Sequence, residues 1–88
     1  EAVLEQHPAV AEAGVAGAAD PAWGRVPVAF VKFRDGASAS AEELRAFCAG
    51  RLAKYKIPVR FIAADELPRN AAGKLLRREL RRRLADNG

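Results

Sequence analysis

The apolar residues fall into short β-rich runs and into helical repeats of three and four, and together they predict six elements. Val10 to Ala18 and Val26 to Phe33 are rich in Val, Ala and Phe, as strands are. The segment DPAWG, residues 20–24, lies between them and is rich in turn-forming residues. Pro27 cannot donate to a sheet ladder, so the second strand either starts near it or presents it at an edge.

A helix is predicted from Ser40 to near Lys56, before Pro58. Ser40 with Glu43 three residues later has the spacing of a capping box. Apolar residues then follow at intervals of three and four, which places them on one face of the helix: Leu44, Phe47, Cys48, Leu52 and Tyr55.

Helical and β-rich segments complete the pattern at both ends. Glu1 to His7 is typical of a helix end before Pro8, and Val59 to Ile62 is typical of a short strand. Pro68 to Gly73 is predicted to be a loop. A basic final helix carries Leu76, Leu80 and Leu84 in a four-residue repeat. We expect an α+β fold, a small sheet of about three strands with helices packed against it.

With 88 residues, half of them apolar, the chain can form one modest core, so residues 1–88 are expected to be a single domain. It contains no Met and starts within a predicted helix, from which we expect a piece of a longer polypeptide. No run is as long as a membrane span, and no secretory signal is evident. We expect a soluble, cytoplasmic protein without a membrane span.

The net charge of +4 is concentrated near the C-terminus. Between Leu67 and Leu84 there are seven basic residues and one acidic residue. Such a patch suits nucleic acid, an anionic membrane face or a phosphorylated ligand, and charge does not choose among them.

Several chemistries have little support in the sequence. One His and one Cys, with no acidic cluster at ligand spacing, predict no metal site. Cys48 is expected to be a core thiol and His7 a structural residue. Ser38 and Ser40 lack a nearby base, so nucleophilic catalysis is not expected.

Lys74 stands between a loop of small side chains and a helix, which is the most informative feature of the chain. Gly73-Lys74 is not a phosphate-binding P-loop, because Pro68 and Leu75 occupy positions where that motif needs Gly and Ser or Thr. A loop can carry the compact positive charge of a lysine into a site built elsewhere. The alternative is a solvated lysine at a turn.

The stretch PRNAAGKLLRREL, residues 68–80, resembles the last signature motif of acyl- and aryl-CoA synthetases, within the adenylate-forming superfamily. Four further segments appear in the order of that family: EAVL with HPAV in residues 1–10, DPAWG in 20–24, VPVAFV in 26–31 and LAKYKIP in 52–58. The resemblance covers nearly the whole chain, and it implies the C-terminal (lid) domain of a larger adenylate-forming ligase.

The resemblance implies that a missing N-terminal domain binds ATP, magnesium and the carboxylic acid, and that this small domain closes over it in two orientations. In the first, the lysine matching Lys74 contacts the reacting groups and helps form the acyl-adenylate. Its role would be electrostatic rather than proton transfer. The isolated chain is expected to be inactive, and its sequence does not name the acid.

In the second orientation the resemblance implies that another face lines the channel for CoA. Trp23, Tyr55 and Arg60 match positions that hold CoA in related aryl-CoA ligases, and Gly73 completes the expected cofactor-binding residues. Alternatively, Trp23 plugs the core edge, Tyr55 is buried on its helix and Arg60 is a solvated strand residue.

The chain departs from the family's pattern at two positions, and two other functions stay open. Ile57 and Val59 stand where some relatives carry basic contacts to CoA phosphates. A peptide-synthetase adenylation domain that loads a carrier protein would have a similar C-terminus. A nonenzymatic nucleic-acid-binding module would use the final basic helix, although the chain has no recognised nucleic-acid motif, and we expect no nucleic acid partner.

Overall fold

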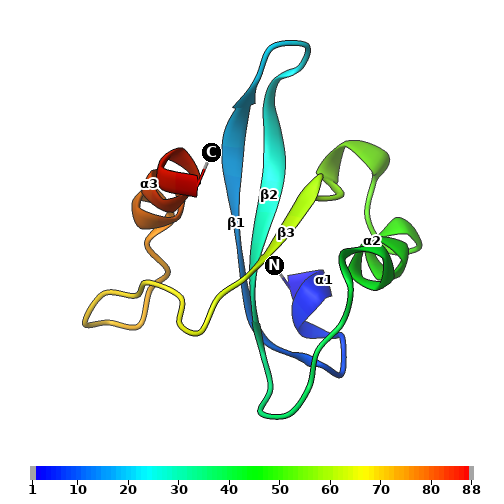
Figure 1. The fold of residues 1–88 in the computed structure, drawn as a ribbon, viewed down its shortest axis with the longest axis vertical. Coiled ribbons are helices and arrows are strands. Elements are labelled where there is room, and N and C mark those ends of the chain that lie inside the picture. The colour runs from blue at the N-terminus through cyan, green and yellow to red at the C-terminus, as the bar shows by residue number, and fades with distance from the viewer. Residues whose placement is uncertain (1, 88) are drawn as a thin grey trace.

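The computed structural model describes residues 2–87 as a three-stranded mixed sheet with helices on both faces (Figure 1). In chain order the elements are α1 (Ala2–Glu5), β1 (Val10–Asp20), β2 (Gly24–Phe33), α2 (Ala41–Ala49), the 3-10 helix η1 (Lys54–Lys56), β3 (Arg60–Ala63) and α3 (Arg77–Asn87). The predicted α+β class and the order of elements are confirmed. The part of the predicted first helix at Glu1 lies outside the described residues.

The sheet has the order β1-β2-β3, with β2 in the centre. β1 and β2 are antiparallel and form a long hairpin from the Val10↔Phe33 pair to the Asp20↔Gly24 pair. Both strands therefore run closer to the turn than predicted. β3 is parallel to β2 and starts at the Val28↔Arg60 pair.

Pro27 lies inside the central strand, where a proline removes a ladder donor. Its carbonyl accepts a hydrogen bond from Val59 N–H at 2.9 Å, just ahead of the first β2–β3 pair. The missing N–H of Pro27 thus falls where the β3 ladder has not begun. The strand neither starts at Pro27 nor is an edge strand, and the proline is accommodated because the β2–β3 ladder begins one residue later.

Side chains of β2 alternate between two hydrophobic clusters on opposite faces of the sheet. Val28 and Phe30 belong to the cluster that α3 covers, whereas Ala29 and Val31 belong to the cluster that α1 and α2 cover. The buried members of the α3 cluster are Ala16, Val28, Phe30, Leu67, Leu80 and Leu84, and those of the other cluster are Leu4, Val10, Ala13, Ala29, Val31, Leu44 and Cys48. Both faces are therefore buried.

The helix α2 begins as predicted but ends earlier. Ser40 Oγ accepts a hydrogen bond from Glu43 N–H at 3.1 Å, and Glu43 Oε1 accepts one from Ser40 N–H at 3.5 Å, so the capping box is confirmed. The expected end near Lys56 is wrong, because the helix stops at Ala49 and Gly50 caps it.

The residues after α2 form a separate turn. Ala53 is extended, with ψ 146°, so the helical hydrogen bonds cannot continue into η1. Leu52 and Tyr55 consequently do not share the face of α2 that their spacing predicted. Leu52 still packs against the cluster under α2, whereas Tyr55 is exposed.

The last helix also differs from its prediction at the first leucine. Leu80 and Leu84 are buried on α3 as expected. Leu76 lies one residue before the helix, where its N–H donates to Pro68 O at 2.9 Å. Within residues 2–87, no helix combines the length and the apolar character needed to cross a bilayer.

Candidate functional site

Residues 69–75, called here the Lys74 hairpin, form a tight reversal between β3 and α3. Arg69 and Leu75 face each other in an isolated antiparallel bridge. Asn70 closes the loop: its N–H donates to Lys74 O at 3.0 Å, and its Oδ1 accepts from Lys74 N–H at 2.9 Å and Ala72 N–H at 3.0 Å. The predicted loop is thus an ordered turn.

Gly73 has the left-handed conformation that this turn requires, with a φ of 82°. Its N–H donates to Asn70 O at 2.9 Å, and no atom lies within 4 Å of where a Cβ would stand. Lys74 follows directly and is exposed. Among the side chains that the structure describes, none forms an ion pair with its ammonium group. The hairpin therefore presents the positive charge of Lys74 to solvent.

Two contacts with β1 hold the hairpin against the sheet. Arg69 donates from Nε to Glu12 Oε1 at 2.9 Å, and from Nη1 to Gly73 O at 2.9 Å. Leu75 packs over Gly14, so closely that a Cβ on Gly14 would lie 2.9 Å from Leu75 Cδ2. Glu12 and Gly14 are two residues apart and share one face of the strand.

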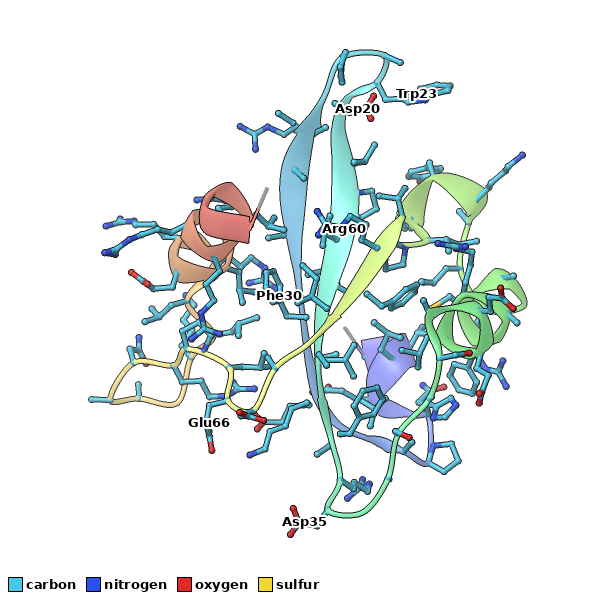
Figure 2. The ribbon with its side chains drawn as sticks, in the orientation of Figure 1. Asp20, Trp23, Phe30, Asp35, Arg60 and Glu66 are labelled. Carbon is cyan, nitrogen blue, oxygen red and sulfur yellow. The ribbon has the colours of Figure 1, made fainter. Side chains whose placement is uncertain are left out.

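Trp23 lies in the turn at the far end of the β1–β2 hairpin (Figure 2). The carboxylate of Asp20 fixes this turn, because its Oδ1 accepts hydrogen bonds from Ala22 N–H and Trp23 N–H, both at 2.9 Å. The Trp23 side chain is 81% exposed. The alternative that Trp23 plugs the edge of the core is therefore wrong.

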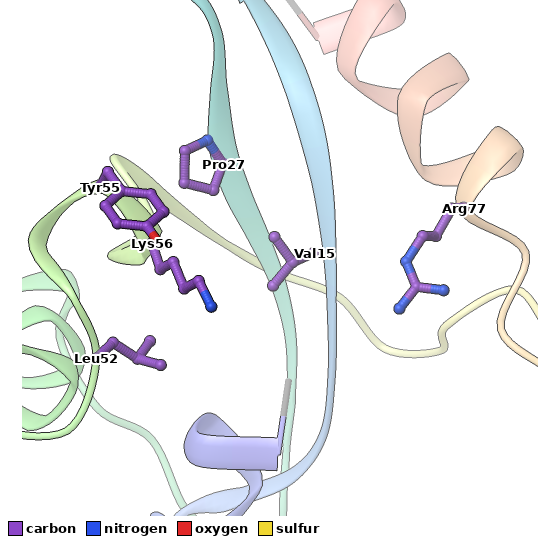
Figure 3. A pocket seen from close by; sticks show the side chains of 6 residues that line it. All are labelled: Val15, Pro27, Leu52, Tyr55, Lys56 and Arg77. Carbon is purple, nitrogen blue, oxygen red and sulfur yellow. The ribbon is translucent and has the colours of Figure 1, made fainter.

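Tyr55 is 78% exposed and lies on the rim of an open groove of ≈ 510 Å³ (Figure 3). The groove is lined by Val15, Pro27, Leu52, Tyr55, Lys56 and Arg77. Lys56 Nζ lies 5.9 Å from the centroid of the Tyr55 ring. The alternative of a buried Tyr55 is wrong, since η1 turns its ring outward.

Arg60 is exposed at the start of β3 and is the ladder partner of Val28. Partners in a ladder share a face, so Arg60 lies on the face that α3 covers. Tyr55 borders the groove on the opposite face, beside Leu52, which packs against the cluster that α1 and α2 cover. Trp23, Tyr55 and Arg60 are thus exposed but do not form one cluster, and the Lys74 hairpin lies apart from the Trp23 turn.

The other candidate residues have structural surroundings. Burial raises the pKa of the Cys48 thiol, more than the nearby Arg51 guanidinium lowers it. His7 Nδ1 accepts a hydrogen bond from Ala9 N–H at 3.1 Å, and its ring meets Phe47 edge-on with centroids 5.0 Å apart. Across the described residues, no three His, Cys, Asp or Glu side chains gather closely enough to hold a metal ion.

Comparison with known proteins decides the family. The model of the AMP-binding enzyme C-terminal domain matches residues 1–74, well over half of the chain. The chain belongs to this family.

Relatives of this AMP-binding enzyme C-terminal domain are much longer than the chain. It is 62% identical over 82 residues to a 2-succinylbenzoate–CoA ligase of Geobacillus kaustophilus, covering 93% of the chain and 17% of that protein. The Bacillus subtilis o-succinylbenzoate CoA synthetase in complex with its acyl-adenylate intermediate has a TM-score of 0.87 at 56% identity, covering 91% of the chain and 16% of that structure. A fatty acyl CoA synthetase of Mycobacterium tuberculosis has a TM-score of 0.90 at 34% identity, covering 99% and 17%.

Sequence reasoning found the tip of the Lys74 hairpin but not what holds it. Arg69 and Asn70 lie within residues 68–80, the segment that resembles the family's last signature motif, and the preference of Asn for turns was a usable signal for Asn70. Glu12 and Gly14 stand more than 50 positions earlier, in a strand of small residues. Nothing local in the sequence connects them to Lys74.

Proposed function

We propose that this chain is the mobile C-terminal domain, residues 1–88, of an ATP-dependent carboxylic acid–CoA ligase. It spans 17% of the length of the G. kaustophilus relative, so the ATP, magnesium and acid sites would lie in an N-terminal domain of the same polypeptide. The name of that relative and the acyl-adenylate bound to the B. subtilis structure support 2-succinylbenzoate as the acid.

The observation that carries the proposal is the exposed ammonium of Lys74 on an ordered hairpin. In the first half-reaction a carboxylate oxygen attacks the α-phosphorus of ATP, and the bond from that phosphorus to the bridging oxygen of pyrophosphate breaks. Both partners are anions. A preorganised positive charge offsets their repulsion as the new bond forms, and Lys74 supplies it.

In the second half-reaction the thiol of CoA attacks the adenylate carbonyl, and AMP leaves. Trp23, Tyr55 and Arg60 would contact CoA after the domain has rotated. Two exposed aromatic rings suit the adenine or the pantetheine arm, and an exposed guanidinium suits a phosphate. Gly73 would let the hairpin backbone approach the nucleotide closely, because it carries no side chain.

The test is Lys74→Ala in the full-length ligase, with the two half-reactions measured separately. We expect acyl-adenylate formation to fall by roughly 10²- to 10³-fold, the usual loss for one preorganised electrostatic group. Conversion of synthetic acyl-adenylate and CoA to thioester should change little, because Lys74 would have left the site. Lys54→Ala is the matched control, since Lys54 is an exposed lysine on η1 and lies outside the hairpin.

Two outcomes would contradict the proposal. An equal loss in both half-reactions would indicate a structural role for Lys74, and no loss in either would remove it from the chemistry. Melting temperatures of the variants separate folding defects from catalytic ones.

A further inference from the structure

We propose that Arg69 is the positioning residue for Lys74, acting through an ion pair with Glu12 on β1. This inference rests on the proposed function. It concerns how the hairpin is aimed, whereas Lys74 itself would touch the reacting groups.

The guanidinium of Arg69 bridges the sheet and the hairpin. Its Nη2 lies 2.7 Å and its Nε 2.9 Å from Glu12 Oε1, while its Nη1 donates to Gly73 O at 2.9 Å. All three nitrogens of one planar group are therefore engaged. Because that plane is rigid, the position of Glu12 fixes the direction of the carbonyl directly before Lys74.

Glu12 is itself held on the other side. Lys32 Nζ lies 3.7 Å from Glu12 Oε2, so the Glu12 carboxylate stands between two cations, Arg69 and Lys32. The same ammonium group lies 3.5 Å from Glu66 Oε1. Glu12 and Lys32 are partners in the β1–β2 ladder. The carboxylate that receives Arg69 is thus fixed to the sheet rather than to a mobile loop.

The ion pair is one of two attachments between the hairpin and β1. Leu75, on the other strand of the hairpin, packs on Gly14, two residues after Glu12. One apolar contact would leave the hairpin able to pivot. The second attachment, through Arg69, removes that freedom and aims the Lys74 side chain.

Stability does not explain the pair well. The Arg69 and Glu12 side chains are 36% and 30% exposed, and ion pairs near the surface contribute little to stability. Asn70 would still close the turn without them. The pair should therefore matter for geometry, and a displacement of about 1 Å of a catalytic group can lower a rate about 10²-fold.

The experiment uses the full-length ligase with Arg69→Met, Arg69→Lys and Glu12→Gln, and measures both half-reactions. We expect Arg69→Met to slow acyl-adenylate formation roughly 10- to 100-fold, with thioester formation from synthetic acyl-adenylate nearly unchanged. Arg69→Lys should recover part of the loss, because one ammonium can pair with Glu12 but cannot also hold Gly73 O. The melting temperature should change little.

Arg82→Met is the matched control. It removes an arginine from another exposed ion pair, with Glu79 on α3, and leaves the Arg69–Glu12 pair in place, so we expect normal adenylate formation. The double variant Glu12→Gln with Arg69→Met should form acyl-adenylate no more slowly than Arg69→Met alone, because both changes break the same ion pair.

Lys74→Ala, run in the same assay, separates this inference from the proposed function. If Lys74→Ala slows adenylate formation and Arg69→Met does not, the positioning role is wrong and the proposed function stands. An equal loss in both half-reactions for Arg69→Met, or the same loss for Arg82→Met, would also overturn it. If Lys74→Ala has no effect, the proposed function is wrong, and the positioning role of Arg69, which rests on it, is wrong as well.

Discussion

Leu75 lies so close to Gly14 that a methyl group on Gly14 would stand 2.9 Å from Leu75 Cδ2 and 3.0 Å from Leu80 Cδ1. Gly14 is an interior strand residue, where glycine is otherwise unfavourable. The missing side chain is what lets the segment after Lys74 rest directly on the sheet.

Gly14→Ala should therefore destabilise the protein. Half-buried Leu75 can move aside, but Leu80 is fully buried and cannot move as readily. Overpacking of this kind typically costs about 1–3 kcal/mol, to be measured as the free energy of unfolding in denaturant. Gly17→Ala is the control, since its Cβ would meet the nearest atom, Arg25 Cδ, at an ordinary 3.5 Å. Equal stability of the two variants would contradict the close contact.

Ser40→Ala should remove the N-terminal cap of α2. The hydroxyl that accepts from Glu43 N–H would be lost, and with it about 0.5–2 kcal/mol of the free energy of unfolding. Ser38→Ala should change stability much less, because Ser38 is exposed outside the helix. Adenylate and thioester formation in the full-length ligase should stay normal, and a selective loss of either would mean that α2 has a direct catalytic role.

Trp23→Ala and Arg60→Ala should raise the apparent KM for CoA in the full-length ligase while adenylate formation stays nearly intact. Both side chains are exposed, so their removal should leave the melting temperature almost unchanged. Arg78→Ala, which removes an exposed arginine of α3, is the control. Damage to both half-reactions would instead favour a role in docking the domain.

Cys48 should make stability depend on pH in the alkaline range. Its pKa in the folded protein is raised above the usual 9.0, because burial disfavours the thiolate. The unfolded state thus loses its proton first as pH rises, so this contribution is fully present below pH 9.0 and is lost through the folded pKa. We expect the free energy of unfolding to fall more steeply above pH 9.0 in the native protein than in Cys48→Ala.

The measurement is a series of denaturant titrations between pH 7 and 10.5 on both proteins. All other ionisable side chains are the same in the two proteins, so the difference between the two slopes isolates the thiol. Parallel slopes would show that Cys48 is more accessible to water than the structure has it. Reaction of the native thiol with a disulfide reagent at pH 8 should also be slow compared with the denatured chain.

The sequence predicted the elements well where the signals were local. The capping box at Ser40 and the β-rich run from Val10 specified where α2 and β1 begin, because each signal involves neighbouring residues. The end of α2 was missed for a physical reason. Leu52 and Tyr55 continue the helical spacing, but α2 ends at Ala49 and the chain is extended at Ala53, and Leu52 reaches the same cluster from outside the helix.

In the candidate site, too, the residues that could be predicted are those whose positions depend on neighbouring residues. Lys74 and Gly73 are recognisable because the hairpin that presents them is local in sequence. Glu12 could not be predicted, because its pairing with Arg69 depends on how the chain returns to β1 after β3 and not on any spacing. The exposure of Trp23 likewise depends on how far the β1–β2 hairpin extends beyond the core.

The hairpin anchor at Glu12 and the turn at Asp20 are eight residues apart on β1, about 26 Å at about 3.3 Å per residue. Continuous hydrogen-bonded ladders join these two ends, so they move together (Figure 1). Under the proposed function, a rotation of the domain that brings the Glu12 end of the sheet to a fixed site moves the Asp20 end away from that site. The order of the two half-reactions would follow from this mutual exclusion, without a signal passing between the residues that perform them.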